Sequence, residues 1–236
     1  MVNILDIKGD EIPTPTKEKG MLELMFERQH HLATKYLPIE KANGLLQTED
    51  FPVILDSRKG QARLKDFAWR TMEELFEATD ALSPDTIGGR EHFLEEMIDA
   101  IHFFIELNLL CGISVLDIKQ FYEVPEELDC FEFLEALAKA LPFTQNPEDI
   151  KLIPESTIIY SCIGQSIGNA MNKLKNKPWK QTHMITDREA FINNLLPAWI
   201  GFFRVLSLKY GLTAKNIFTL YFKKSEVNKF RIKSQY

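Results

Sequence analysis

Residues 95–104 read EEMIDAIHFF, a segment that is largely apolar but carries acids at three of its first five positions. On a helical wheel of about 100° per residue, Glu96 and Asp99 fall on the arc of the apolar side chains. The opposite arc is polar and is expected to face solvent; it carries Glu91, Glu95, His102 and Glu106. The segment therefore predicts a buried helix with two inward carboxylates.

The preceding stretch, EELFEATDAL (73–82), has the same character. Glu74 shares an arc with small and aromatic residues, and Glu77 lies at the edge of that arc. Residues three apart on a helix are neighbours, about 5–6 Å apart at Cβ. Each of the two helices therefore offers a carboxylate pair, one spaced ExxE and the other ExxD.

Four carboxylates gathered on partly apolar surfaces would repel one another and lose hydration. The free-energy cost is on the order of several kcal/mol for each uncompensated ion. A divalent cation removes this conflict. Oxygen ligands without His or Cys favour Mg²⁺ or Mn²⁺, which suit attack of water on phosphorus. A solvated acidic surface is the alternative interpretation, because charged side chains on helices are usually exposed.

Helical periodicity runs through the chain and predicts an all-α protein with a single domain over 1–236. Glycines and prolines separate the expected helices, and the stretch 141–156 is the expected linker. The expected helices are 20–36, 61–82, 90–111, 114–122, 130–140, 157–175, 187–209 and 213–231.

Two segments repeat without a gap: FFIELNLLCGISVLDIKQFY (103–122) and FFRVLSLKYGLTAKNIFTLY (202–221). The repeat predicts two related helical hairpins, in the halves 61–122 and 157–221. Ser114 and Thr213 follow a glycine in each copy and are expected N-caps. The second copy has Leu195 and Ala198 at the positions of Glu96 and Asp99, so the hairpin scaffold does not require the acids in order to fold.

Composition excludes several classes of protein. The chain has 236 residues, 45% of them hydrophobic, and a formal charge of 28 − 34 = −6, which argues against nucleic-acid or membrane-surface binding over the whole molecule. Three separated cysteines without CxxC spacing indicate neither a disulfide framework nor a zinc site. Without a recognisable leader or uncharged membrane span, a cytoplasmic location is expected.

The order EELFEATDAL then EEMIDAIHFF resembles the ExxE…ExxD signature of the all-α nucleoside triphosphate pyrophosphatases, which include MazG proteins and the dimeric dUTPases. The segment MLELMFERQHHL (21–32) resembles the dimeric dUTPase segment that carries a glutamine near the base. The ending LYFKKSEVNKFRIKSQY (220–236) resembles that of the same branch and of phage dCTPase-dUTPases. Four motifs in the same order are more specific than ExxE alone.

The resemblance implies a homodimeric helical bundle that cleaves a nucleoside triphosphate to the monophosphate and pyrophosphate. It implies Glu74, Glu77, Glu96 and Asp99 as Mg²⁺ ligands, with Mn²⁺ as a substitute. Glu74 and Glu77 would be catalytic, with Glu74 orienting the attacking water. The substrate-binding residues that it implies are Gln29 near the pyrimidine, and Lys224, Asn228 and Arg231 at the phosphates and sugar.

The sequence departs from the family pattern at Ser225, Ile232 and Gln235, which affects the grip on phosphates or base. The Trp-Lys cluster normally found between the carboxylate motifs is absent there, but KNKPWKQT (175–182) in the second repeat offers Lys180 as a phosphate contact. An exposed basic turn is the other interpretation of that segment.

The expected reaction is hydrolysis of dUTP to dUMP and pyrophosphate, with dCTP or several dNTPs as the nearest alternative. Asp99-x-x-His102 is half of a di-iron carboxylate motif, which needs Glu-x-x-His from two helices, so a di-iron protein is a more remote alternative. A non-catalytic helical binding protein is the third. The aromatic run WIGFFRVLSLKY (199–210) is expected in the core or at a dimer interface.

Overall fold

The computed structural model describes residues 12–83, 89–141, 143–144 and 147–234, and within these ranges it contains helices and no β-strand. The prediction of an all-α chain is confirmed. The helices in chain order are α1 (Met21–Ala42), α2 (Arg58–Ala81), α3 (Gly89–Leu110), α4 (Val115–Phe121), α5 (Cys130–Ala140), the 3₁₀ turn η2 (Pro147–Leu152), α6 (Glu155–Ile158), the π turn η3 (Ile159–Gly164), α7 (Gln165–Lys173), α8 (Arg188–Leu195), α9 (Ala198–Phe203), the π turn η4 (Arg204–Lys209) and α10 (Ala214–Ser234).

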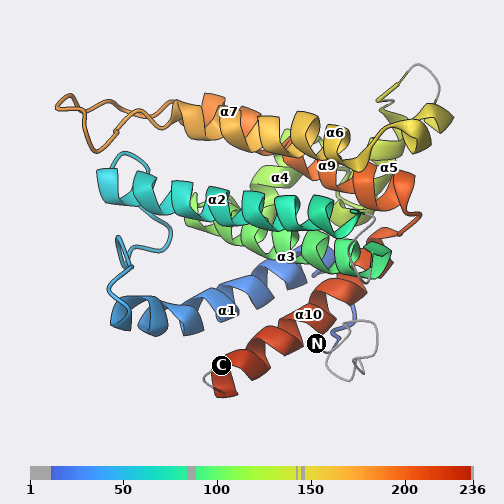
Figure 1. Cartoon of the computed structure of the whole chain (residues 1–236), viewed down its shortest axis with the longest axis horizontal. Helices are drawn as coiled ribbons and strands as arrows, with labels where there is room; N and C mark the ends of the chain where they lie inside the picture. Colours follow the sequence, from blue (N-terminus) through green and yellow to red (C-terminus); the bar gives the residue numbers. More distant parts are fainter. Residues whose placement is uncertain (1–11, 84–88, 142, 145–146, 235–236) are drawn as a thin grey trace.

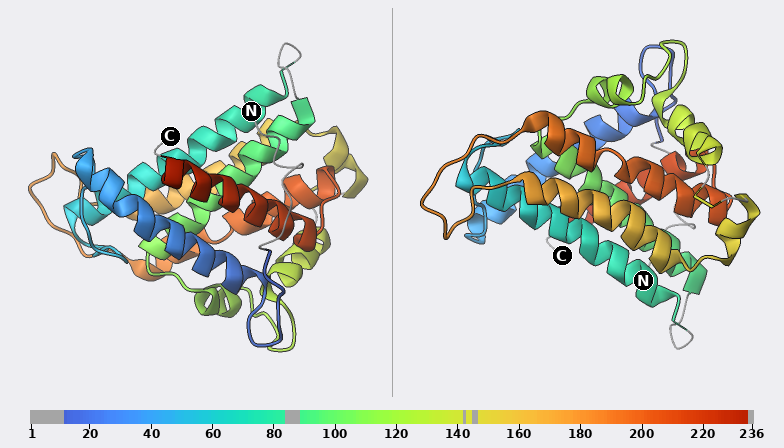
Figure 2. Two further views of the ribbon diagram at one scale, coloured as in Figure 1. Left: turned by 90° about the horizontal axis from the view of Figure 1, so that it is seen from below. Right: turned by 90° about the horizontal axis from the view of Figure 1, so that it is seen from above.

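Helix α3 is enclosed by the rest of the molecule. It pairs along its length with α2, while α1 and α10 pack on one side and the second hairpin lies on the other (Figures 1 and 2). Ile98, Phe104 and Ile105 of α3 are accordingly inaccessible to solvent. Removal of apolar surface of this extent from water is the main stabilising contribution to such a bundle.

The glycine stop and the N-cap that follows it are confirmed in both copies of the repeat. Gly112 and Gly211 both have left-handed backbone angles, with φ of 67° and 72°, which a glycine adopts without steric cost. Ser114 forms a capping box with Asp117, and Thr213 exchanges the same pair of hydrogen bonds with Asn216. Both copies therefore end one helix and start the next in the same way.

Several predicted boundaries are wrong. Helix α1 continues through Pro38 to Ala42, because one proline removes a single helix hydrogen bond and this end of the helix is exposed. The predicted helix 187–209 is divided at Pro197, which is the N-cap residue of α9. The predicted helix 157–175 contains the π turn η3, and the expected linker 141–156 contains η2, with part of it outside the described residues.

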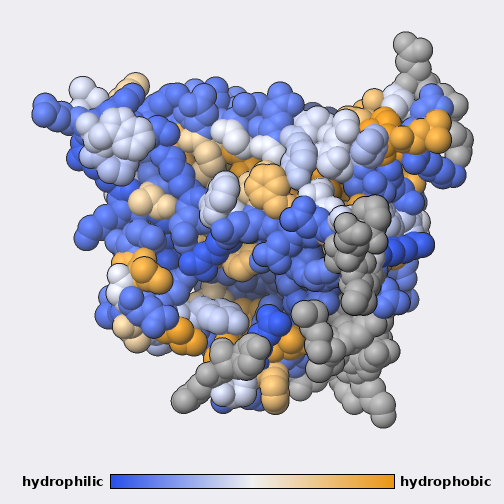
Figure 3. All heavy atoms as spheres, viewed as in Figure 1, coloured by the Kyte–Doolittle hydropathy of each residue, from blue (hydrophilic) through white to orange (hydrophobic). Residues whose placement is uncertain are grey.

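The aromatic run after Pro197 lies in the core. Trp199, Phe202 and Phe203 are buried and pack against Phe104 and Phe131. Arg188–Lys209 is long and apolar enough to cross a membrane, but 67% of its most apolar window is buried inside the protein, as in the core helix of a soluble protein. The face seen in Figure 3 is mainly hydrophilic, with scattered small apolar patches.

The expectation of a solvated strip on α3 is wrong for two of its four members. His102 and Glu106 are only 3% and 5% exposed, whereas Glu91 is exposed and Glu95 is half-buried. The reason lies outside the helix, because α1 and α10 cover this face. Both polar side chains must then find partners inside the protein.

Gly201 allows a close approach between α9 and η3. A Cβ at this position would lie 2.6 Å from Ile163 Cγ1 and 3.0 Å from Cys162 Cβ. We expect Gly201→Ala to destabilise the protein by about 1 kcal/mol, since overpacking costs about 1–3 kcal/mol and the gain in helix propensity returns about 1 kcal/mol. Urea unfolding followed by circular dichroism measures the change.

Gly168→Ala on α7 is the matched control, because a Cβ there meets nothing within 4 Å. That variant should be more stable than the wild type by up to about 1 kcal/mol. Equal changes in the two variants would show that the α9–η3 approach does not need a glycine.

Candidate metal centre and adjoining cavity

Three of the four predicted acids meet between α2 and α3. One ligand oxygen from each of Glu74, Glu96 and Asp99 lies within 4.8 Å of the others. The pairing of α2 with α3 faces Glu74 toward the i, i+3 pair on α3. A set made only of carboxylate oxygens is suited to a hard divalent cation, with water or phosphate oxygens completing its coordination.

The acids disturb one another strongly. Desolvation, together with the charges of Asp99, Glu96 and Glu77, raises the pKa of Glu74 to about 9. Burial also raises the pKa of Asp99 to about 6, although Lys224 acts in the opposite direction. By itself the protein therefore holds part of this cluster protonated near neutral pH.

Lys224 of α10 is the cation closest to this cluster. Its Nζ lies 2.6 Å from Asp99 Oδ2 and 2.6 Å from Glu95 Oε1, and the residue is 3% exposed. These two acids raise the pKa of Lys224 above its usual value despite its burial. The predicted phosphate contact thus lies against the acid cluster and is not among the residues that line the adjoining cavity.

Glu77 does not join the group of three acids. It is exposed on α2, one helical turn beyond Glu74, and its charge contributes to the raised pKa of Glu74. A fourth direct ligand at this position would require the side chain to turn toward the cluster.

A cavity of about 370 Å³ adjoins the acids and collects most of the predicted substrate residues. Its wall includes Glu74 and Asp99 from the cluster, and also Gln29, Asn228 and Arg231. The described lining is completed by Leu32, Tyr36, Glu40, Asn43, Leu45, Arg70, His102, Phe103 and Glu106. Residues from α1, α2, α3 and α10, far apart in the sequence, therefore share one chamber.

Gln29 is at the centre of a buried polar network on the wall of the cavity. Its Nε2 lies 2.8 Å from Glu106 Oε2, and its Oε1 lies 2.8 Å from His102 Nδ1 and 3.0 Å from the Tyr221 hydroxyl. The rings of His102 and Tyr221 stack with centroids 3.9 Å apart. His102 thus faces Gln29 and the Tyr221 carbonyl, and it is outside the cluster of Glu74, Glu96 and Asp99.

The sequence pattern of α3 places Glu106 and His102 on a solvated strip and does not reveal this network. The available signal was the helical spacing of Phe218, Tyr221, Phe222 and Ser225 on α10, which form a face that the structure buries. Lys180 is also apart from the site, since its carbonyl accepts a hydrogen bond from Arg58 at the start of α2. Glu74 lies about 24 Å further along that helix at 1.5 Å per residue.

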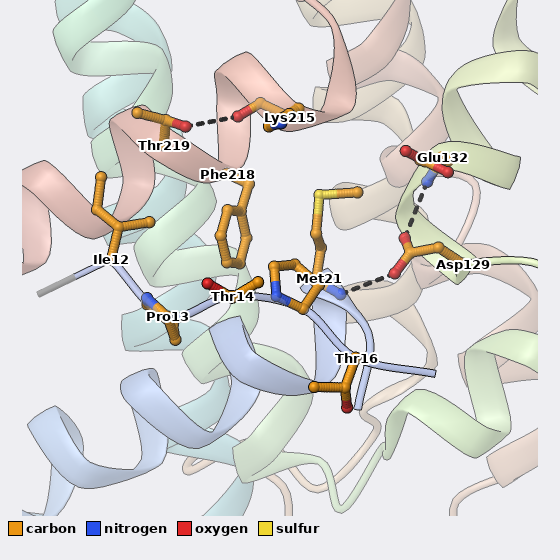
Figure 4. Close-up of a pocket in the computed structure, with 11 residues that line it drawn as sticks. Ile12, Pro13, Thr14, Thr16, Met21, Asp129, Glu132, Lys215, Phe218 and Thr219 are labelled. Atoms are coloured by element: carbon orange, nitrogen blue, oxygen red, sulfur yellow. Dashed lines mark hydrogen bonds between the residues drawn. The ribbon is translucent and has the colours of Figure 1, made fainter. Parts of the chain in front are cut away.

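Two other cavities lack a comparable set of groups. One, of about 510 Å³, lies between the N-terminal segment and α10 and includes Asp129 (Figure 4). The oxygens of Asp129 already accept hydrogen bonds from Met21 N and Phe131 N, at 2.8 Å each. The other, of about 520 Å³, is lined mainly by apolar side chains near Phe51 and Val115.

The raised pKa of Glu74 gives a testable dependence of stability on pH. An acid whose pKa is higher in the folded than in the unfolded protein favours unfolding as pH rises from about 4.5 toward 9. We expect Glu74→Gln to stabilise the protein by about 1–2 kcal/mol near pH 8, after allowing for solvent screening, and to change little near pH 4.

Thermal unfolding at the two pH values, without divalent cations, measures this effect. Glu73→Gln is the matched control, because Glu73 is exposed on the same helix and should show no comparable pH-dependent gain. A Glu74→Gln variant less stable than the wild type at pH 8 would contradict a repulsive acid cluster.

Comparison with protein-family profiles, curated proteins and solved structures gives no match for this chain. Its likeness to the nucleoside triphosphate pyrophosphatases therefore rests on the motifs in the sequence. The arrangement of the acids and the cavity is a property of the fold itself.

Proposed function

We propose that this protein is a Mg²⁺-dependent pyrimidine deoxynucleoside triphosphate pyrophosphatase, with dUTP as the first substrate to test and dCTP as the second. The observation that carries the proposal is the shared chamber. Glu74 and Asp99 on its wall belong to the acid cluster, and Gln29, Asn228 and Arg231 line the same space. A cavity with convergent polar groups and perturbed pKa values is the usual form of a small-molecule site.

Each group has a separate task in the proposed reaction. Bound Mg²⁺ would neutralise the carboxylates of Glu74, Glu96 and Asp99. It would also attract the phosphates of the substrate, which are negatively charged. Arg231 and Asn228 supply hydrogen-bond donors for phosphate and sugar oxygens. Lys224 limits the repulsion around Asp99 and Glu95 by its two ion pairs.

Glu74 is the acid in this proposal that orients the attacking water and accepts its proton. Water attacks the α-phosphorus, the bond from this phosphorus to the bridging oxygen breaks, and the products are the nucleoside monophosphate and pyrophosphate. Positioning and charge stabilisation supply most of the rate enhancement in such a reaction. A cytoplasmic location and a homodimer are part of the same proposal; the location rests on the composition of the chain, and the homodimer rests on the resemblance.

The alternatives receive less support from the site. A di-iron protein would use His102 as a ligand, but both of its ring nitrogens face other groups, Gln29 and the Tyr221 carbonyl. A non-catalytic helical binding protein would have no need for acids that raise one another's pKa beside a cavity. Turnover separates these alternatives.

Release of pyrophosphate from dUTP, dCTP, dTTP and the purine dNTPs with Mg²⁺ tests the proposal. We expect turnover of dUTP or dCTP, and a loss of at least about 100-fold in Glu74→Ala and Asp99→Ala, the scale of loss for removal of a group that stabilises the transition state. Lys180→Ala should retain wild-type turnover because Lys180 lies at the other end of α2.

Glu91→Ala is a second control on α3, outside the acid cluster. Helical circular dichroism should remain the same in all these variants. Absence of pyrophosphate release with every dNTP, in protein that is folded and supplied with Mg²⁺ or Mn²⁺, would reject the proposed activity.

A further inference from the structure

The hydrogen-bond contacts of the Gln29 network limit which of its side chains can carry protons. The Tyr221 hydroxyl has one hydrogen and faces two acceptors in the recorded orientation, Met25 O at 3.1 Å and Gln29 Oε1 at 3.0 Å. His102 Nε2 faces the Tyr221 carbonyl at 3.2 Å and its Nδ1 faces Gln29 Oε1. Both ring nitrogens therefore face acceptors.

A neutral imidazole does not fit these contacts, since it carries one N–H and one lone pair. In either tautomer one lone pair of His102 would point at an oxygen. Only an imidazolium would satisfy both contacts, but complete burial lowers the pKa of His102 to about 3. The recorded amide orientation thus requires a buried charge that the surroundings disfavour.

A half-turn of the Gln29 amide exchanges its nitrogen and oxygen and resolves each contact. Nε2 then donates to His102 Nδ1 and to the Tyr221 oxygen, and Tyr221 donates to Met25 O. Oε1 then lies where it faces Glu106 Oε2, and an acceptor at that place requires a proton on Glu106. All contacts are satisfied with neutral side chains.

The surroundings of Glu106 favour the neutral acid. Desolvation raises the pKa of Glu106 to about 7, the nearby charge of Glu40 acts in the same direction, and Gln29, Arg63 and Arg70 act against it. Both arginines are held by Glu40, at 2.8 and 3.1 Å. The other groups facing this acid from the packed helices are Tyr36 on α1, His102 on α3 and Tyr221 on α10.

We propose that Glu106 is a positioning residue that carries a proton. By donating a hydrogen bond to Gln29 Oε1 it fixes the Gln29 amide on the part of the cavity wall where the base of the substrate would lie. The second oxygen of Glu106 has no hydrogen-bond partner among the described residues and lies on the same wall. It serves as an acceptor for an N–H of the base, which uracil presents at N3 and cytosine at its amino group. This role in base binding rests on the proposed function, whereas the proton on Glu106 does not.

The predicted consequence is a pyrimidine site that weakens as pH rises through the titration of Glu106. Ionised Glu106 cannot donate to Gln29, so the amide turns back, and one lone pair of the neutral His102 ring then faces an oxygen again. Deoxyuridine is the probe, because it is uncharged near neutral pH and needs no metal. We expect its affinity to be about tenfold lower near pH 8 than near pH 6.

Glu106→Gln tests the proton directly. A glutamine here donates from its amide to Gln29 at every pH and keeps an acceptor toward the cavity. We expect deoxyuridine to bind this variant with equal affinity near pH 6 and pH 8, close to the wild-type value at pH 6, as measured by calorimetry. Glu91→Gln on the exposed face of α3 should retain the wild-type pH dependence.

A Glu106→Gln variant that keeps the wild-type pH dependence, or loses deoxyuridine at both pH values while its melting temperature is unchanged, would overturn the proposal. A wild-type protein that binds no deoxyuridine would overturn the role in base binding. The protonated network can then be tested by stability alone. The raised pKa of Glu106 makes the folded state less favourable as pH rises from about 4.5 to 7, which lowers the melting temperature. Glu106→Gln should lack this loss of melting temperature, and an equal loss in the two proteins would overturn the network as well.

Discussion

The enclosure of α3 by helices on both sides is the constraint on which the rest of the structure depends. A helix in this position loses the solvent that normally satisfies polar side chains. Each buried acid and imidazole on it must obtain a charge partner, a hydrogen bond or a proton from the surrounding elements. The candidate site consists of these buried polar side chains of α3 together with the groups from neighbouring helices that pair with them.

The buried polar side chains in the two halves of α3 have different kinds of partner. Toward its N-terminus, Asp99 is paired with Lys224, and Glu96 meets Glu74 from α2. Toward its C-terminus, Glu106 and His102 share the amide of Gln29 and have no ion pair with any residue that the structure describes. In the proposed enzyme the first arrangement would hold a cation and phosphates, and the second would form an uncharged wall beside the base.

The internal repeat explains why the acids can be specialised. The second hairpin uses the same glycine stop and the same N-terminal cap, but it buries Leu195 and Ala198 where the first has Glu96 and Asp99. Apolar side chains at these positions stabilise the packing without any desolvation cost. The acids of the first hairpin are therefore an addition to a scaffold that folds without them.

The sequence by itself determined the helices, the stops at Gly112 and Gly211, and the inward direction of Glu74, Glu96 and Asp99, because these depend on local backbone preferences and on the 3.6-residue period. Local reasoning failed where the cause was distant along the chain. His102 and Glu106 look like a solvated strip until α1 and α10 cover them. Which face of a central helix is covered, and therefore which acids lose water, is decided only when all the helices pack together.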